Sequence, residues 1–235
     1  MIQRKLLLGV LLVFLGSLSG ILAIGAHSQN SGAPEARHLR NVRQLTAGGE
    51  NAEAYFSSDN RRLIYQAHRG EDTCDQMFTM NVDGSDRRMV SNGRGRTTCG
   101  YFLADNKHIV YASTHEGGAS CPARPDRSKG YVWAVYAGFD IYRADETGKI
   151  EQKLTSAAGY DAEATVNWKN NEILYTSKSS GDLELWTMKP DGSQKKQMTK
   201  SVGYDGGPVF SRDGSKMVWR AFHPSTAEQT KTYKD

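Results

Sequence analysis

Acidic residues recur at matching places along the chain, at a spacing that could assemble a cation-binding site. The segments Gly49-Glu-Asn-Ala-Glu-Ala54 and Gly159-Tyr-Asp-Ala-Glu-Ala164 align with each other, and Tyr204-Asp205 repeats part of the same pattern. Because hard cations such as calcium prefer several oxygen ligands, a ring of these carboxylates would suit a cation or another small ligand. The candidate residues are Glu50, Asn51, Glu53, Asp161, Glu163 and Asp205, of which Asp161 and Glu163 are weak candidates for metal ligands.

The same repetition has a structural alternative. Each acidic side chain could accept hydrogen bonds from main-chain N–H groups at the start of a strand, and repeats share such scaffold duties more readily than single sites. Because the acidic residues recur at the same position of the repeat, this structural role is favoured. His115 and Arg220 fall at or just beyond the ends of the second predicted strands of their units, and we expect them to lie on the same rim as these carboxylates. We expect no resident cofactor except the calcium that these carboxylates could bind.

One stretch breaks the regularity of the chain and carries a second set of candidate binding residues. Tyr111 and Tyr142 are 31 residues apart, whereas the equivalent pairs elsewhere are 13 and 11 residues apart. Residues 114–138 are therefore an insertion, and long loops on a rigid scaffold commonly carry binding. The insertion combines basic and aromatic side chains, namely Arg124, Arg127, Lys129, Tyr131, Trp133 and Tyr136. This mixture predicts an anionic or aromatic partner, unless the loop folds back and buries its own rings.

The chain has three cysteines, Cys74, Cys99 and Cys121. A disulfide is chemically reasonable in an exported protein, and an odd count leaves one thiol over. All three pairings remain open. The short paired spacing that is typical of zinc sites is missing, so we expect no cysteine-bound metal.

Catalytic motifs are also missing from the sequence. There is no Gly-x-Ser-x-Gly elbow, no His-Glu-x-x-His and no phosphate-binding P-loop. We expect a protein that is not an enzyme, with one reservation: the chain could be the non-catalytic part of a longer hydrolase.

A repeated hairpin pattern identifies the elements that must position these residues. Tyr55-Phe-Ser-Ser-Asp-Asn-Arg-Arg-Leu-Ile-Tyr65 aligns with segments that begin at Tyr101, Thr165 and Val209, at offsets of 46, 64 and 44 residues. A second pattern, Met80-Asn-Val-Asp-Gly-Ser85, recurs from Met188, and a third, Gln44-Leu-Thr46, recurs as Lys153-Leu-Thr155 and Gln197-Met-Thr199. Asp-Asn and Asp-Gly suit tight hairpins because these residues tolerate positive φ. Each unit therefore reads as four short antiparallel strands, the pattern of a β-propeller blade.

These repeats resemble the WD40-like (PD40) repeats of the TolB-type β-propellers, which are also similar to the propellers of prolyl-oligopeptidase-type proteins. The matching pieces are the Leu-Thr that ends a blade, the Phe-Ser-x-Asp-Gly hairpin and the Met-x-x-Asp-Gly-Ser turn. The resemblance covers about residues 42–222. It implies an all-β propeller, and it implies little about function because propellers host many activities.

The number of units predicts three complete blades and a partial fourth. The blades cover about residues 46–91, 91–155, 155–199 and 199–222, followed by a tail, 223–235. Propellers of the resembling type generally close with six or more blades, so we expect the chain to be part of a larger ring. Val42–Leu45 could supply an outer strand that closes a blade.

The N-terminal residues have the composition of an export signal. Arg4 and Lys5 precede an uncharged apolar run over residues 6–25 that ends in small residues. We expect residues 1–26 to be a cleaved signal peptide or an uncleaved anchor in the inner membrane, with residues 27–41 as a linker. Without Arg4 and Lys5, 28 basic residues face 26 acidic ones, a net charge of +2 that does not indicate nucleic-acid binding.

Together these features predict a periplasmic, non-catalytic propeller that binds a protein or peptide partner in the cell envelope through the face that carries the insertion. Two alternatives remain. The first is the propeller domain of a hydrolase whose catalytic domain lies outside this chain, and the second is a cation or small-ligand protein that uses the carboxylate rim.

Overall fold

The computed structural model describes residues 38–69, 74–128, 130, 132 and 134–234. The chain divides into two compact units, Met1–Gln44 and Leu45–Asp235. In the first unit, the described residues 38–44 form no strand or helix. The predicted signal or anchor over residues 1–26 lies outside the described residues. The second unit contains all the described strands.

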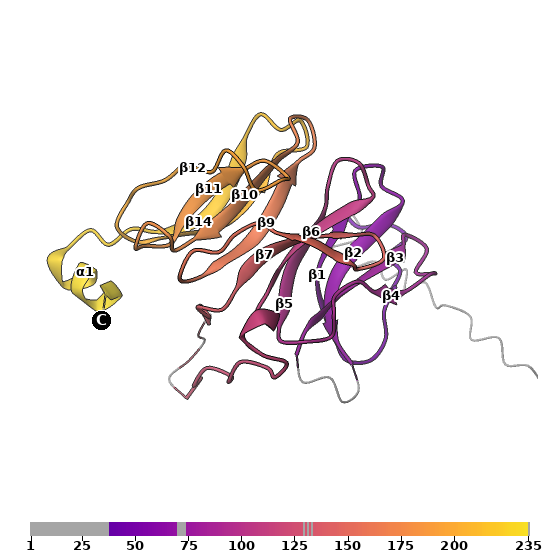
Figure 1. The fold of residues 1–235 in the computed structure, drawn as a ribbon, viewed down its shortest axis with the longest axis horizontal. Coiled ribbons are helices and arrows are strands. Elements are labelled where there is room, and N and C mark those ends of the chain that lie inside the picture. Colours follow the sequence, from indigo (N-terminus) through magenta and orange to yellow (C-terminus); the bar gives the residue numbers. More distant parts are fainter. Residues whose placement is uncertain (1–37, 70–73, 129, 131, 133, 235) are drawn as a thin grey trace, which may run out of the picture. The chain divides into compact units, whose positions relative to one another are not determined.

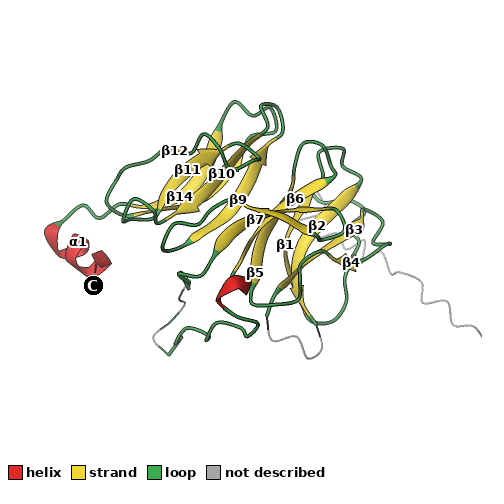
Figure 2. Cartoon of the chain, viewed as in Figure 1, coloured by secondary structure: helices red, strands yellow, loops and turns green. Residues whose placement is uncertain are grey.

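The second unit is a series of antiparallel sheets (Figures 1 and 2). Three sheets have four strands each and the fourth sheet has two. The first three comprise β1 (Glu50–Phe56), β2 (Arg62–His68), β3 (Gln76–Asn81) and β4 (Arg88–Met89); β5 (Thr97–Phe102), β6 (His108–Ser113), β7 (Asp140–Asp145) and β8 (Ile150–Lys153); and β9 (Asp161–Asn167), β10 (Glu172–Ser177), β11 (Glu184–Met188) and β12 (Lys196–Gln197). The last comprises β13 (Tyr204–Phe210) and β14 (Met217–Phe222), followed by the helix α1 (Ala227–Lys234). The predicted all-β propeller of three complete blades and a partial fourth is confirmed.

The hairpin turns form where the sequence predicts them, for the expected physical reason. Asn60, Asn106 and Asn171 lie between the first and second strands of their blades with φ between 52° and 57°. In the fourth blade, Gly214 does the same with φ of 71°. Asparagine and glycine adopt this left-handed conformation at low cost, so the repeated Asp-Asn and Asp-Gly pairs determine where each strand reverses.

Successive blades pack face to face through their apolar side chains. One core joins the first two blades through Ile64, Met77, Phe102 and Ile109, all of them fully buried. A second core joins the next two through Val110, Ile173 and Tyr175, among others. β5 accordingly contacts β1, β2 and β3 on one side and β9 on the other, and β9 contacts β13 (Figure 1).

The outer edges of the blades also meet in a repeated way. The last residue before each blade-closing Thr or Ser lies against the glycine of the next blade's Asp-Gly or Thr-Gly turn. A Cβ added at Gly148 would lie 2.8 Å from the Cα of Val90, and one at Gly192 would lie 3.1 Å from the carbonyl oxygen of Leu154. Leu45 takes the same place against Gly84 of the first blade. Residues 42–45, which we expected could supply an outer strand, form no strand in the structure.

The partial fourth blade exposes a face that is covered in the other three. Val218 is 63% exposed, whereas its repeat equivalents Ile64, Val110 and Leu174 are completely buried. Among the described residues, no helix has both the length and the apolar character that crossing a bilayer requires.

Candidate functional site

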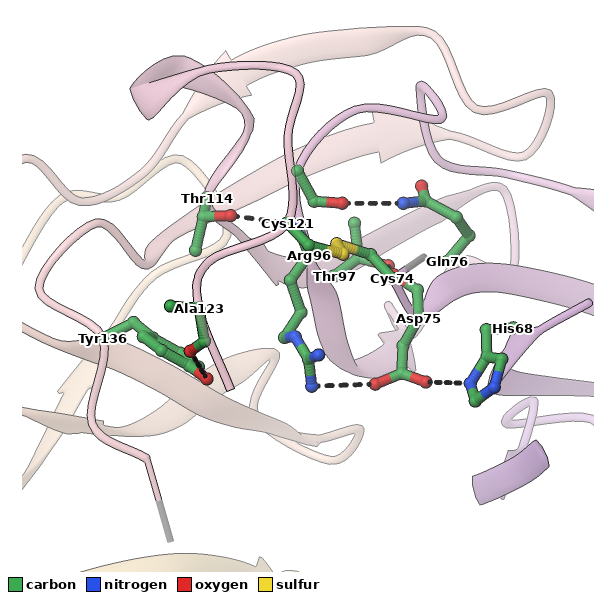
Figure 3. Close-up of a disulfide and its surroundings, with 11 residues drawn as sticks. His68, Cys74, Asp75, Gln76, Arg96, Thr97, Thr114, Cys121, Ala123 and Tyr136 are labelled. Carbon is green, nitrogen blue, oxygen red and sulfur yellow. Dashed lines mark hydrogen bonds and ion pairs between the residues drawn. A yellow bond between two sulfur atoms is a disulfide. The ribbon is translucent and has the colours of Figure 1, made fainter. Parts of the chain in front are cut away.

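The inserted loop of the second blade is fastened to the first blade by a disulfide. Cys121 in the insertion is bonded to Cys74, which precedes β3, with the two Cα atoms 5.5 Å apart, a normal separation for a disulfide (Figure 3). Cys99 keeps a free thiol. The loop is further held by Tyr136, whose hydroxyl donates to the carbonyl of Ala123 at 2.7 Å. The disulfide therefore ties Cys121, and the described part of the insertion around it, to the first blade.

Charged side chains next to this disulfide contact one another in a row. The guanidinium of Arg96 contacts Asp75 Oδ2 at 3.3 Å, and Asp75 Oδ1 lies 3.3 Å from His68 Nδ1 (Figure 3). Glu50 Oε2 lies 3.6 Å from the same nitrogen. The main chain of Asp75 is also fixed, because its carbonyl accepts hydrogen bonds from the amide and the hydroxyl of Thr97. These groups are thus ordered before any ligand arrives.

The inserted loop and these charged side chains line a cavity of about 230 Å³, which we call the insertion cavity. Its lining residues are Glu50, His68, Asp75, Arg96, Arg124, Pro125, Arg127 and Tyr136. Three arginines face two carboxylates, so the lining has an excess of positive charge. Arg96 also lies over the ring of Tyr136, with its guanidinium carbon 6.0 Å from the ring centre.

A second cavity of about 150 Å³ adjoins the insertion cavity and is more apolar. The two share Asp75, Arg96, Pro125, Arg127 and Tyr136, and the second adds Val132, Ala134 and Phe139 among others. A ligand that spans both would place an anionic group near the arginines and an apolar group beside Phe139.

Two of the remaining acidic candidates, Glu53 and Glu163, lie on the first strands of their blades, at a β-bulge that recurs in every blade. The bulge positions are Glu53, Cys99, Glu163 and Gly207, which are repeat equivalents and have φ between 52° and 59°. In each blade the pairing of the first and second strands shifts at this place. Such a bulge redirects a side chain out of the sheet, and here it directs the side chains toward the adjacent blade.

The bulge residues connect each blade to the next. Gln66 Oε1 of the first blade accepts a hydrogen bond from the amide of Cys99 at 3.2 Å. The Cys99 sulfur accepts one from the amide of Glu163, and Glu163 Oε2 accepts one from the amide of Gly207 at 2.7 Å. Glu163 Oε2 also accepts from the Thr176 hydroxyl. The bulge amides of the second, third and fourth blades are therefore each satisfied by a side chain of the preceding blade.

A cavity of about 210 Å³ lies beside these bulges, lined by Glu53, Tyr55, Cys99, Glu163 and Arg220 among others. Its groups are already engaged with one another. Arg220 contacts Glu163 Oε1 at 3.3 Å, and Tyr55 donates to Glu53 at 2.6 Å. Burial raises the pKa of the Cys99 thiol to about 12, so the thiol stays protonated and weakly nucleophilic at neutral pH.

Asp161 and Asp205 are buried within their own blades. Asp161 accepts hydrogen bonds from Ser177 and Thr155, while burial raises its pKa. Asp205 accepts one from Trp219 Nε1 at 2.7 Å and lies 3.1 Å from His223 Nε2. Both carboxylates contact side chains, and not the main-chain N–H groups of the structural alternative.

The other sequence candidates are dispersed. Asn51 accepts from Arg69 at 3.0 Å, and the His115 ring packs 4.4 Å from that of Tyr142. Of the sequence candidates, Glu50, Arg124 and Arg127 meet in the insertion cavity. Trp133, Lys129 and Tyr131 lie outside the described residues.

Sequence reasoning missed His68, Asp75 and Arg96, because none of them is copied between blades or belongs to a motif. The equivalence of Glu53, Cys99, Glu163 and Gly207 could have been found, since they stand at the repeat offsets of 46, 64 and 44 residues, but those offsets do not reveal a bulge.

Comparison with known proteins supports the resemblance seen in the repeats. No family model matches the chain. A TolB homolog of Chlorobium luteolum is 38% identical over 53 residues, which is 22% of this chain and 12% of that protein. The structure of a protein assigned as TolB from Agrobacterium tumefaciens superposes with a TM-score of 0.58 at 18% identity, over 74% of this chain and 55% of the other. TolB from Acinetobacter baumannii gives 0.56 at 14% identity, over 76% and 39%.

The chain thus spans about half the length of these solved relatives, or less. The relatives share the sheet architecture, and the curated relative shares local sequence with the chain. The blades of this chain therefore share the β-propeller fold of these TolB structures.

Proposed function

We propose that this chain is an exported, non-catalytic propeller whose insertion cavity binds a protein or peptide partner in the cell envelope. The observation that carries the proposal is the disulfide-fastened insertion, which departs from the repeat and builds a cationic cavity over two blades. A preformed cavity loses little conformational entropy when a partner binds, which favours recognition by a rigid surface.

The chemistry of the cavity points to an acidic peptide segment with a neighbouring apolar side chain. Arg96, Arg124 and Arg127 can pair with carboxylates, and arginine does so with two parallel hydrogen bonds. The adjoining apolar space beside Phe139 suits the second side chain. Because one cavity is cationic and the adjoining one is more apolar, a partner that fills both needs an acidic and an apolar side chain.

Two further observations support export and a binding role. The signal-like composition of residues 1–26 agrees with the Cys74–Cys121 disulfide, since disulfides persist in oxidising compartments such as the periplasm. The free thiol at Cys99 has a raised pKa and is poorly suited to nucleophilic catalysis.

Selection from a random peptide library displayed on phage, with the full-length chain as bait, tests this proposal. We expect enriched peptides to contain acidic and apolar residues close together. The double variant Arg124→Ala, Arg127→Ala should bind them at least about tenfold more weakly, as expected when charge-assisted hydrogen bonds are lost. The matched control is Lys195→Ala, Lys196→Ala, which removes two exposed cations from the β11–β12 turn. Selection without acidic enrichment, or equal binding by both double variants, would contradict the proposal.

A further inference from the structure

Three side chains with metal-ligating atoms converge at one edge of the first blade. Glu50 begins β1, His68 ends β2 in register with it, and Asp75 immediately precedes β3. One ligand atom from each lies within 4.8 Å of the others, which holds for no other such group in the described part of the chain. We propose that Glu50, His68 and Asp75 form a divalent-cation site that prefers zinc.

Two of the three separations between the ligand atoms fit a tetrahedral ion. Two ligands that are each about 2.0–2.1 Å from a tetrahedral zinc ion lie about 3.3 Å apart. His68 Nδ1 is 3.3 Å from Asp75 Oδ1 and 3.6 Å from Glu50 Oε2. Imidazole nitrogen with carboxylate oxygens is also a donor set that zinc accepts. The third pair, Glu50 and Asp75, lies within 4.8 Å, and the exposed Glu50 side chain can move to complete the set.

The surroundings hold one of the three ligands, Asp75, in place. Arg96 engages Asp75 Oδ2 and leaves Oδ1 directed at His68. The carbonyl of Asp75 is fixed by Thr97, and the preceding residue, Cys74, is fixed by its disulfide. Supporting contacts of this kind orient metal ligands and contribute strongly to affinity.

The site would leave one position of the ion open. All three residues line the insertion cavity, together with Arg124 and Arg127. A tetrahedral zinc ion with three protein ligands binds its fourth ligand from the solvent or from a substrate. Here the open position faces a cavity that can hold an anion. Zinc binding by these residues does not depend on peptide binding, so the two ideas succeed or fail separately.

Another histidine provides a matched control. His108 also lies between two carboxylates, with Nδ1 2.5 Å from Asp105 Oδ2 and Nε2 3.4 Å from Glu151 Oε2. These contacts use opposite ring nitrogens, so they cannot converge on one ion. His68→Gln and His108→Gln therefore make the same chemical change with and without convergent geometry.

Calorimetric titration of the full-length chain with zinc tests the proposal. We expect one zinc ion per chain for wild-type protein, and an affinity at least about a hundredfold weaker for His68→Gln and Asp75→Asn, since even supporting contacts are worth 10- to 100-fold. Because Glu50 is 81% exposed, Glu50→Gln should weaken binding without disturbing the fold, as thermal unfolding will verify. His108→Gln should bind zinc like wild type.

Absence of zinc binding in the wild-type chain would overturn the proposal. So would equal loss in His68→Gln and His108→Gln, which indicates general surface binding. Titration with cobalt gives an independent check, because a sulfur-to-cobalt absorption band would identify Cys99 as a ligand and contradict the assigned nitrogen and oxygen donors.

Discussion

The carboxylate of Glu163 in the third blade accepts a hydrogen bond from the main-chain amide of Gly207 in the fourth, with 2.7 Å between Oε2 and N. The same oxygen accepts from Thr176 at 2.7 Å. Glu163 is 6% exposed, so both donors depend on it for a partner. This contact gives Glu163 a structural role that requires no bound ion.

Removal of the Glu163 carboxylate should destabilise the fold more than removal of the carboxylate of Glu53, its repeat equivalent. Glu163→Ala leaves two donors without their acceptor, which should lower the free energy of unfolding by about 2–3 kcal/mol. Glu53→Ala is the matched control, since Glu53 is exposed and accepts a hydrogen bond from the nearby Tyr55 hydroxyl. It should cost under about 1 kcal/mol. Denaturant unfolding measures both, and equal losses would contradict the blade-connecting role.

The disulfide should stabilise the chain and hold the insertion in place. Cys74 and Cys121 are 47 residues apart in the sequence, and in the chain-entropy account a disulfide that closes a loop of this length stabilises the fold by about 4 kcal/mol. We expect Cys74→Ser, Cys121→Ser to lose a large part of that stability, whereas Cys99→Ser, which changes a free thiol, should lose under about 1 kcal/mol. Thermal unfolding under oxidising and reducing conditions measures the difference. A double variant as stable as wild type would show that the insertion does not depend on this bond.

The contact between Val90 and Gly148 should tolerate no side chain. Gly148→Ala places a methyl group 2.8 Å from the main chain of Val90 and keeps φ at +92°, so clash and backbone strain add. Gly181→Ala is the control, because Gly181 has φ of +101° and no atom within 4 Å of the added carbon. We expect a loss of about 1–2 kcal/mol for Gly181→Ala and at least about 2 kcal/mol more for Gly148→Ala. Similar losses in denaturant unfolding would mean that the blades do not approach closely there.

The β13–β14 turn should make stability depend on pH. Hydrogen bonds from Ser211 and Ser215 lower the pKa of Asp213 from 3.8 to about 2. A lowered folded-state pKa contributes stability that is present above the unfolded value of 3.8 and is lost as pH falls toward 2. The difference in unfolding free energy between wild type and Asp213→Asn should therefore be largest near neutral pH and narrow below about pH 4. A difference that widens in acid would contradict this sign.

Local signals predicted the fold well, because turns and strand patterns act over a few residues. Asn60, Asn106 and Gly214 stand at turns for reasons that their residue types reveal. The bulges were not predicted, since glutamate and cysteine give no sign of the left-handed conformation that Glu53, Cys99 and Glu163 adopt. There, contacts with the adjacent blade decide the backbone conformation.

The candidate site was only partly predictable. Composition singled out Arg124 and Arg127, but the pairing of Cys74 with Cys121 depends on two segments that only the folded chain brings together. The same applies to His68 and Asp75, which acquire meaning through Glu50 and Arg96 beside them. The acidic ring of the sequence divides instead into the insertion cavity, the bulges and the buried strand starts.

The most direct test of the central claim is a photo-crosslinking measurement with a selected acidic peptide. A photoreactive residue would replace Pro125, an uncharged lining residue of the insertion cavity, in one full-length variant and Lys195 in another, and mass spectrometry would identify the attached peptide. If the insertion cavity binds the partner, the variant at position 125 will crosslink in competition with unlabelled peptide and the variant at position 195 will not. Crosslinking only from position 195, or equally from both, would contradict the claim.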